Sequence, residues 1–521
     1  MISVSEEPRK KINRIVVLGG GSAGFLAAFG IKKQMPEIEV VVVRSTKMGV
    51  IGVGEGTIWS VVNFLHHFIG IPAEDFHKKI NPSIKLGIHY LWGPRPFFNY
   101  TFAPQLTAPL KGSEIPRGYF CDEDFDYADM ASVLMTHDKV CIRKPNGLPH
   151  LPGSFAYHLE NRLFVGYLEE LASEYEIETI DDLVCGVEDD EDGINTLILE
   201  SGQKVSADFF IDCSGFRAEL IGKALNEEFK SFQDVLYCDR AIFGGWERTP
   251  DDPYHPYTTA ETMNSGWSWQ IEHDHVVNRG YVYCSQFISD DEADAEFRKR
   301  NPNIEHTKSV KFNAGVRKRT WVKNVIAFGN AAGFVEPLEA TAIGMICDGV
   351  VNFVRAIKST GGYLAPAARD AYNRLQETNW ELIRDFLAVH YKFNKRLDTP
   401  FWNACINDTN LGGAQKYIDL YHEVGPDFSL LTTEMKRDFF GAEGYLSMLV
   451  GQQLPYRRQL DLSFEEKHRW KLYRNNLKES IYEAMDMKEY LEFVRGSGLP
   501  EFSESKRLPA EAEGVGELQW H

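Results

Sequence analysis

The glycine-rich stretch near the start of the chain restricts its fold more than any other feature. Ile15–Leu18 is a short, continuously apolar run, typical of a buried parallel strand. Gly19, Gly21 and Gly24 follow in the spacing G-x-G-x-x-G, and an alanine-rich helix is expected from there to about Gln34. A second apolar run, "IEVVVVRS", predicts the next strand. The order strand, tight turn, helix, strand indicates a βαβ unit that binds a dinucleotide.

Each residue of this loop has a separate expected role. Gly19 allows the turn, Gly21 lets the backbone approach a pyrophosphate, and Gly24 lets the helix pack closely against the strand. Ser22 and Ala23 lie at the helix N-terminus, where unpaired N–H groups favour a phosphate. We therefore expect all five residues to bind the cofactor.

The residue that usually completes this motif is an acid about 20 positions further on, which binds a ribose hydroxyl. This chain instead has Arg44, at the end of "VVVVRS". An arginine here is compatible with the 2′-phosphate of NADP, and equally with the ribose or adenine of FAD. Its position alone does not decide between the two.

Two later segments favour FAD. Residues 204–216, "KVSADFFIDCSGF", and residues 323–344, "KNVIAFGNAAGFVEPLEATAIG", each predict a strand that ends at a cofactor contact. A return to the dinucleotide so late in the chain suits an FAD-binding domain assembled from separated segments. Gly329 and Asn330 follow the second strand, and Asn330 replaces the usual aspartate but can still bind a ribityl hydroxyl. Between the segments, turns at Asp192–Gly193 and Ser201–Gly202 predict a β-meander.

Charge and composition exclude several partners. The net charge of −19 argues against a nucleic-acid surface, because phosphate binding needs clustered lysine and arginine. The eight cysteines are scattered without zinc-ligand spacing, so we expect no metal site and reduced thiols in a cytoplasmic protein. The uncharged run from Ile15 to Ile31 contains the glycine motif, and no other approaches membrane-spanning length. Helices are expected over 365–395 and 460–495.

The stretch "SGWSWQIEH" carries two large aromatic side chains close together. On a strand, Trp267, Trp269 and Ile271 all point to one face. That face is either ordinary core packing or a wall that keeps a substrate away from a reactive cofactor.

Five blocks in this order resemble the flavin-dependent halogenases of the tryptophan-halogenase family. They are "GGGSAGFLAA", "IGVGEGT" (51–57), "NPSIKLGIHYLWG" (81–93), "GWSWQI" (266–271) and "GNAAGFVEPLEATAI" (329–343), within about residues 12–350. The resemblance implies an α/β fold with an FAD-binding Rossmann-like domain of the GR2 or p-hydroxybenzoate hydroxylase (PHBH) type. That domain is expected from residues 1–100, 155–235 and 310–360. A β-rich and helical substrate-binding domain is expected from 101–154, 236–309 and 361–500, followed by a tail over 501–521.

The resemblance also implies a reaction. FADH2, oxygen and a halide ion give hypohalous acid, which crosses a short tunnel to a lysine beside an electron-rich aromatic substrate. Lys85 matches that lysine, and it could hydrogen-bond the acid or form a haloamine if burial lowers its pKa. Glu339 matches the second catalytic residue. By pattern alone, Lys85 could be a solvated strand residue and Glu339 a solvated acid at a helix start.

Further roles follow from the same resemblance. Backbone N–H groups of Thr341 and Ala342 are expected to bind the halide at a helix N-terminus. The flavin strap is expected to contact the cofactor through Gly52, Gly54 and Glu55. Trp267, Trp269 and Ile271 are expected to separate the flavin from the substrate and so to prevent direct oxygen transfer to the ring.

Two departures from the tryptophan-specific members bear on the substrate. Ala340 stands where those members usually have serine, and Glu272 stands where the family usually has proline, which predicts a more open pocket. We therefore expect a free-standing small aromatic of indole or phenol type. The sequence does not rank chlorination, bromination and iodination. No nicotinamide-binding domain is evident, so FADH2 is expected from a separate NAD(P)H flavin reductase. The alternatives are an FAD-dependent aromatic monooxygenase and a non-catalytic FAD-binding redox sensor.

Overall fold

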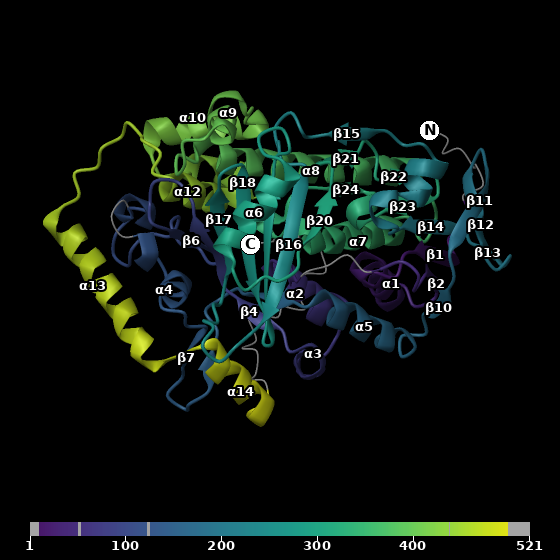
Figure 1. Ribbon diagram of the computed structural model, residues 1–521, viewed down its shortest axis with the longest axis horizontal. Coiled ribbons are helices and arrows are strands. Elements are labelled where there is room, and N and C mark those ends of the chain that lie inside the picture. Colours follow the sequence, from purple (N-terminus) through teal and green to yellow (C-terminus); the bar gives the residue numbers. More distant parts are fainter. Residues whose placement is uncertain (1–9, 50–53, 122–124, 437, 499–521) are drawn as a thin grey trace, which may run out of the picture.

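The computed structural model describes residues 10–49, 54–121, 125–436 and 438–498. Gly52 of the expected flavin strap and the tail over 501–521 lie outside the described residues. Figure 1 shows the parallel sheet around β1 towards one end of the molecule and the late helices α9, α10 and α12 towards the other.

A six-stranded sheet forms around the glycine motif. Its order is β10 (Glu178–Asp181), β2 (Glu39–Arg44), β1 (Arg14–Leu18), β14 (Phe209–Asp212), β23 (Val325–Ala327) and β22 (Trp321–Val322). All neighbours pair parallel except β22, which is antiparallel to β23. The valine-rich strands are buried on both faces, as expected of a parallel sheet covered by helices. The predicted βαβ opening, with α1 (Ser22–Gln34) between β1 and β2, is confirmed.

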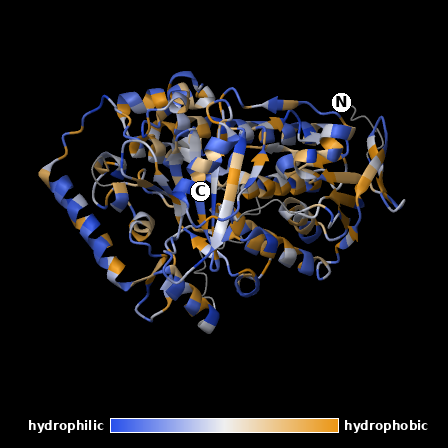
Figure 2. Cartoon of the chain, viewed as in Figure 1, coloured by the Kyte–Doolittle hydropathy of each residue, from blue (hydrophilic) through white to orange (hydrophobic). Residues whose placement is uncertain are grey.

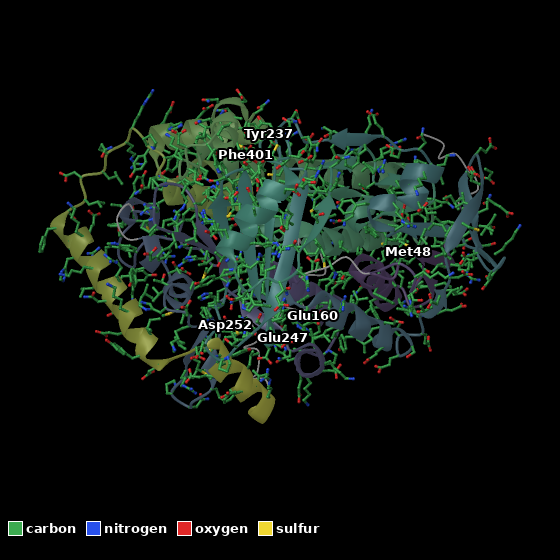
Figure 3. All side chains as sticks on the ribbon, in the orientation of Figure 1. Met48, Glu160, Tyr237, Glu247, Asp252 and Phe401 are labelled. Atoms are coloured by element: carbon green, nitrogen blue, oxygen red, sulfur yellow. The ribbon has the colours of Figure 1, made fainter. Side chains whose placement is uncertain are left out.

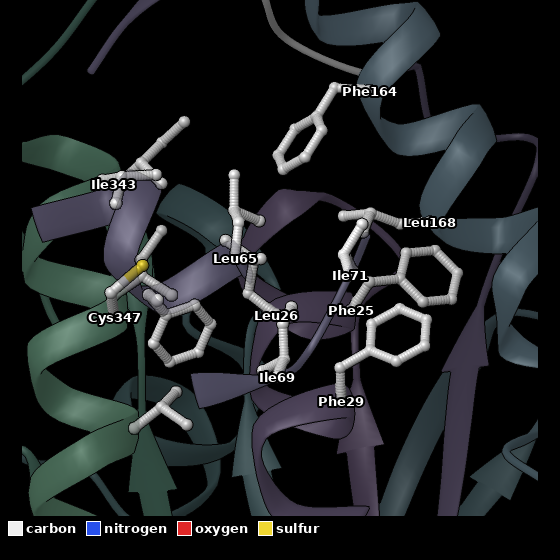
Figure 4. Packing of buried hydrophobic residues seen from close by; sticks show 14 of the residues in the cluster. Phe25, Leu26, Phe29, Leu65, Ile69, Ile71, Phe164, Leu168, Ile343 and Cys347 are labelled. Atoms are coloured by element: carbon white, nitrogen blue, oxygen red, sulfur yellow. The ribbon is translucent and has the colours of Figure 1, made fainter. Parts of the chain in front are cut away.

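Helices from distant parts of the chain close one core over this sheet. Figure 4 shows Phe25 and Phe29 of α1 packed near Leu168 of α5 (Asn161–Ala172), with Ile343 and Cys347 of α7 (Thr341–Ser359) on the other side. The helix that begins at the glycine motif therefore packs into one core with the helix that begins just after Glu339.

A seven-stranded sheet forms the second large layer. Its order is β20 (Lys308–Lys311), β16 (Arg240–Glu247), β19 (Val276–Tyr283), β18 (Gly266–Glu272), β17 (Thr258–Met263), β5 (Gly87–Leu91) and β6 (Phe98–Thr101). Its neighbours pair antiparallel except β17 and β5, which are parallel. The strand that carries the two tryptophans, β18, lies two strands away from β5.

The stretch "SIKLGIHY" (83–90), in which the pattern places Lys85 on a strand, is divided into two strands. Ser83–Lys85 forms β4, which joins a small sheet in the order β3 (Glu55–Gly56), β9 (Ala156–Leu159), β4. The chain then turns at Leu86, whose N–H donates to the carbonyl of Pro256, and continues as β5 in the seven-stranded sheet. Lys85 therefore lies where the two sheets meet.

The meander is confirmed as β11 (Val184–Asp190), β12 (Gly193–Leu199) and β13 (Lys204–Ser206). The remaining strands form two further three-stranded sheets. One contains β15 (Phe229–Ser231), β21 (Gly315–Arg317) and β24 (Gly333–Phe334), and the other contains β25 (Ala484–Met485), β7 (Cys141–Arg143) and β8 (Pro149–His150).

The helix over 365–395 is confirmed as α8 (Pro366–Phe393), and it leads to α9 (Pro400–Asp408), α10 (Gln415–Val424) and α12 (Gly441–Gly451). The expectation of helix over 460–495 is wrong in the middle of that range. There, α13 (Phe464–Ser480) and α14 (Met487–Ser497) are separated by a short turn and by β25, because β25 pairs with β7. The other α-helices of the described residues are α2 (Trp59–Asn63), α3 (Ala73–Ile80), α4 (Met130–Thr136), α6 (Asp290–Arg300) and α11 (Thr432–Met435).

The polarity of the helices varies with their position in the molecule. Figure 2 shows α13 largely hydrophilic at the outer edge, and Figure 3 shows side chains such as Phe401 of α9 on the late helices. Across the part of the chain that the structure describes, no helix is both long and apolar enough to span a membrane.

Candidate active site

The three motif glycines are required for different reasons. Gly19 has φ +125°, and a Cβ on it would overlap the carbonyl oxygen of Cys213. A Cβ on Gly24 would overlap the carbonyl oxygen of Gly19. A Cβ on Gly21, in contrast, would meet nothing within 4 Å. Packing therefore explains the first and third glycines, while the open space at Gly21 fits a ligand that approaches the backbone closely.

The N-terminus of α1 can bind an anion. Gly21 is its N-cap and no side chain caps the helix, so the first N–H groups are available to a pyrophosphate. The Ser22 hydroxyl donates to Oδ1 of Asn161 at 2.9 Å, so Ser22 offers its backbone N–H rather than its hydroxyl. These features fit the phosphates of a dinucleotide.

Residues 323–344 return to the glycine-rich loop at the start of α1, as expected for FAD. Gly329 and Asn330 lie in a 3₁₀ turn over Gly329–Ala331, and Gly329 has φ +60°. A Cβ on Gly329 would come within 3.0 Å of Cβ of Ala23. A cavity of about 40 Å³ is lined by Gly329 and Asn330 and also by Thr341 and Ala342. The expected ribityl contact and the expected halide contacts therefore share one cavity.

Arg44 ends β2 beside the motif. A Cβ on Gly20 would lie 2.6 Å from Cβ of Arg44, so the arginine packs along the loop. Its guanidinium forms an ion pair with Glu169 of α5. Because Glu169 already balances the charge, Arg44 suits the ribose or adenine of FAD better than the 2′-phosphate of NADP.

The described part of the expected flavin strap lies next to Lys85. Glu55 and Gly56 form β3, which pairs with β9, and burial raises the pKa of Glu55 to about 7. Gly54 has φ +90°, and a Cβ on it would lie 2.5 Å from Nε2 of His273. Glycine is therefore required at Gly54 by both conformation and space.

Lys85 is buried in the protein. Its side chain is 0% exposed, and its Nζ has no hydrogen-bond partner among the described residues. Burial lowers the pKa of Lys85 to about 7, against the opposing effect of the Glu339 charge. The interpretation of Lys85 as a solvated strand residue is wrong, because Ser83 and Ile84 beside it are also fully buried. With this pKa, the Lys85 amine is present in both the charged and the neutral form near pH 7. The charged form can bind an electrophile and the neutral form can attack one.

Glu339 is also buried, with 3% exposure. It ends a 3₁₀ turn over Pro337–Glu339, directly before α7, so the interpretation as a solvated acid is wrong. Its Oε1 accepts hydrogen bonds from the hydroxyl of Tyr90 and from the ring of His390, whose Nε2 lies at 2.6 Å. Tyr90 lies in one of the quoted blocks and His390 in α8, and sequence reasoning missed both. Only Tyr90 left a signal, as a buried position of the strand after Lys85.

The turn before α7 has an unusual backbone. Ala340 has φ +54°, in the left-handed region, and it is the N-cap of α7 without any side-chain cap. The N–H groups of Thr341 and Ala342 are therefore available at a helix N-terminus. An anion such as a halide is favoured there by the helix dipole.

The two tryptophans form a tilted pair on one face of β18, with ring centroids 6.1 Å apart. Trp269 packs directly against Gly280 of β19, since a Cβ on that glycine would overlap its ring. Trp267 donates from Nε1 to Oε2 of Glu336 at 3.3 Å, and Tyr391 donates to the same oxygen at 2.8 Å. These contacts fix the rings, so the face is well packed whatever its role.

Glu272 does not open this face. Alternation along β18 places its side chain on the side opposite the tryptophans. There its Oε2 lies 2.6 Å from Nη2 of Arg248, and both side chains are buried. The more open pocket expected from Glu272 is therefore not supported by its position.

Comparisons with known proteins show which family the chain is similar to. A family model described as tryptophan halogenase matches residues 14–464. Tryptophan 7-halogenase RebH of Lentzea aerocolonigenes is 31% identical over 445 residues, which cover 79% of this chain and 82% of RebH.

Solved structures match almost the whole chain. MibH, a lanthipeptide tryptophan 5-halogenase, has a TM-score of 0.84 at 33% identity, covering 94% of this chain and 95% of MibH. BrvH, a flavin-dependent halogenase from Brevundimonas sp. BAL3, has a TM-score of 0.81 at 26% identity, covering 92% of this chain and 99% of BrvH.

Proposed function

The chain belongs to the tryptophan halogenase family, an enzyme family that uses FAD and halide, and from that premise we propose that it halogenates a small electron-rich aromatic of indole or phenol type. The observation that carries the proposal is the buried Lys85, whose amine has no hydrogen-bond partner among the described residues and whose pKa is lowered to about 7 at the meeting point of the two sheets. An unpaired buried amine destabilises a fold, so its presence favours a chemical role.

The cofactor fits the residues that would hold it. Gly19, Gly21, Gly24 and the N-terminus of α1 suit the pyrophosphate, and Asn330 suits the ribityl chain. When bound, FADH2 supplies the two electrons with which O2 converts a halide ion and a proton into hypohalous acid and water. Thr341 and Ala342 hold the halide through their N–H groups.

Lys85 receives the hypohalous acid in this proposal. At neutral pH its amine is present in both protonation states, so it can donate a hydrogen bond to the oxidant or attack its halogen. Trp267, Trp269 and Ile271 keep the substrate ring away from the flavin. Halogen transfer, rather than direct oxygen transfer, is then the reaction available to the ring.

Glu339 completes the proton balance. When the carbon–halogen bond forms, the ring carries one proton too many, and the carboxylate of Glu339 accepts it. The oxygen of the hypohalous acid leaves as water. The whole step converts an aromatic C–H and hypohalous acid into an aromatic C–X and water.

Two supporting proposals concern partners. We propose that a separate NAD(P)H flavin reductase delivers FADH2, because the family match spans nearly the whole chain and none of the sequence motifs indicates nicotinamide binding. We also propose a cytoplasmic location, which is supported by the absence of a disulfide among the eight cysteines of the described residues. The free-standing substrate is supported by Ala340, which replaces the serine usual in tryptophan-specific members.

The test is a halide-dependence assay with FADH2, oxygen and a panel of indole, phenol, free tryptophan and a tryptophan-containing peptide. Wild type is expected to halogenate a small aromatic only when halide is present, and Lys85→Ala to lose this activity. Lys78→Ala, at an exposed lysine of α3, is the matched control and should retain it. Halide-independent oxygenated products would favour the monooxygenase. Tight FAD binding without any product would favour the redox sensor.

A further inference from the structure

A threonine and a histidine lie beside Lys85 in the junction between the two sheets. Thr258 is the first residue of β17, and its Oγ1 lies 2.8 Å from Nε2 of His158. His158 is in β9, where it pairs with Gly56 on one side and with Ser83 on the other. Both side chains are buried, so their polar atoms must be satisfied within the protein.

The surrounding hydrogen bonds determine which atom of this pair donates. The Ser83 hydroxyl donates to the carbonyl of Glu272 at 2.6 Å, so its only hydrogen is committed. Its oxygen lies 3.5 Å from Nδ1 of His158 and can only accept from it, which places the ring hydrogen on Nδ1. Burial and the nearby charge of Lys85 hold the pKa of His158 well below its usual value, so the ring is neutral.

It follows that Nε2 of His158 carries a lone pair and that the Thr258 hydroxyl donates to it. With its hydrogen committed, Oγ1 of Thr258 can offer only lone pairs to any other group. A methyl group on Gly56 would lie 3.3 Å from this oxygen and 3.3 Å from Nζ of Lys85. A buried donor without a hydrogen-bond partner among the described residues and a buried acceptor therefore converge beside the bare Cα of Gly56.

We propose that Lys85, Thr258 and Gly56 form the binding pocket for one molecule of hypohalous acid, with His158 as the positioning residue for Thr258. The O–H of the acid donates to Oγ1 of Thr258, and its oxygen accepts from Nζ of Lys85. The halogen then has no polar partner in the pocket and is directed to the aromatic ring. The inference rests on the proposed function and adds Thr258, His158 and Gly56 to it.

The atoms balance when the halogen leaves this pocket. The O–X bond breaks and the C–X bond forms, with the ring supplying the electron pair of the new bond. The oxygen keeps its own hydrogen, takes one proton from the Lys85 ammonium and leaves as water. The ring proton passes to Glu339, so Lys85 and Glu339 both end the step neutral.

The test measures how much hypohalous acid escapes into solution and how much of it halogenates the aromatic substrate. A chromogenic scavenger in solution reports hypohalous acid that escapes, and chromatography reports the halogenated ring. In Thr258→Val, which keeps the side-chain shape, total oxidant is expected to be unchanged while the halogenated fraction falls about tenfold, the loss of one hydrogen bond to a reacting group. Thr258→Ser keeps the hydroxyl, so its halogenated fraction should stay close to that of wild type.

Two further variants test the other members of the pocket. His158→Phe removes the acceptor that orients Thr258, and it is expected to shift the division in the same direction with FAD binding unchanged. Gly56→Ala places a methyl group between Lys85 and Thr258 and should also lower the halogenated fraction. Thr259→Val, at the next position on the opposite face of β17, is the matched control and should behave as wild type.

The outcomes separate this inference from the function beneath it. If wild type yields no halogenated product, the proposed function fails. If wild type halogenates and Thr258→Val or Gly56→Ala divides the oxidant as wild type does, the pocket is wrong and the function stands. A fall in total oxidant together with lost FAD binding in Thr258→Val would also overturn the pocket, because it would assign the threonine to the fold.

Discussion

Nε2 of His390 lies 2.6 Å from Oε1 of Glu339, while Nδ1 of the same ring lies 2.8 Å from the carbonyl oxygen of Phe386. A carbonyl can only accept, so Nδ1 carries a hydrogen. A short contact between Nε2 and a carboxyl oxygen requires one proton between them. Glu339 and His390 therefore share one proton, and the hydroxyl of Tyr90 donates to the same oxygen.

This shared proton predicts a kinetic role for His390. His390→Gln keeps an amide that can hydrogen-bond to Glu339 but cannot exchange a proton with it. We expect the halogenation kcat to fall about a hundredfold, the lower range for general acid–base catalysis, with KM and total oxidant unchanged. Steady-state kinetics with trapped oxidant measured in parallel checks this.

Tyr90→Phe is the companion variant, since it removes one hydrogen bond to Glu339 and leaves the shared proton in place. Its kcat should fall by less than that of His390→Gln. A His390→Gln enzyme with wild-type kcat would show that Glu339 acts without its imidazole partner.

The glycine motif gives a prediction that separates cofactor binding from folding. Gly21→Ala introduces a methyl group that meets no protein atom within 4 Å, so the thermal midpoint should match that of wild type. FAD affinity should fall because the methyl group occupies the space at the helix N-terminus where the pyrophosphate would lie. Fluorescence titration with FAD and thermal unfolding of the apoprotein measure the two effects.

Gly24→Ala is the contrasting variant, because its methyl group would overlap the carbonyl oxygen of Gly19. It should lower both stability and FAD affinity. If Gly21→Ala binds FAD as tightly as wild type, the pyrophosphate does not lie against this loop.

These contrasts show what local sequence could and could not predict. The βαβ opening follows from continuous apolar runs around the glycine motif, and the meander follows from its turn residues. The structure has both, and α8, where they were expected. The division at Leu86 was not predictable in this way, since it depends on a hydrogen bond to Pro256, which is distant in the sequence. The interruption between α13 and α14 likewise depends on pairing with β7.

The site residues also differ in whether the sequence could identify them. Lys85 and Glu339 were identified through a family resemblance, whereas the strand pattern at Lys85 favoured an exposed side chain. It is buried because one sheet ends and another begins there, so both faces are covered. His390 and Thr258 approach these residues only through tertiary packing, and no short-range pattern in the sequence marks them, whereas Tyr90 is marked only as a buried position of the strand after Lys85.

The buried Lys85 predicts a pH-dependent stability difference. Its pKa is lowered to about 7 in the folded protein, while the unfolded lysine titrates near 10.5. Between these values the unfolded chain binds more protons, so this residue makes stability rise with pH across that window. At or below pH 7 its full cost is present, at about 1.4 kcal/mol for each pKa unit.

Lys85→Met, which keeps the side-chain volume and removes the charge, should therefore raise the thermal midpoint above wild type at pH 6.5 while abolishing halogenation. The difference should shrink towards pH 10. Paired thermal scans across this range measure it, with Lys78→Met as the exposed control. An equal midpoint at pH 6.5 would mean that the amine is not held in a low-dielectric site.

The packing of Trp269 against Gly280 separates the two interpretations of the tryptophan face. Gly280→Ala adds a methyl group that would overlap the indole ring, and it should displace Trp269 at a cost of about 1–3 kcal/mol, as for other overpacked sites. If the face is only core, the variant loses stability and divides the oxidant between product and solution as wild type does. If the face is a wall between flavin and substrate, the halogenated fraction falls as well, because the path of the oxidant past Lys85 is no longer enforced. We expect the second result. Gly186→Ala, where the added methyl group meets Ile198 at an ordinary 3.7 Å, is the control and should alter neither quantity.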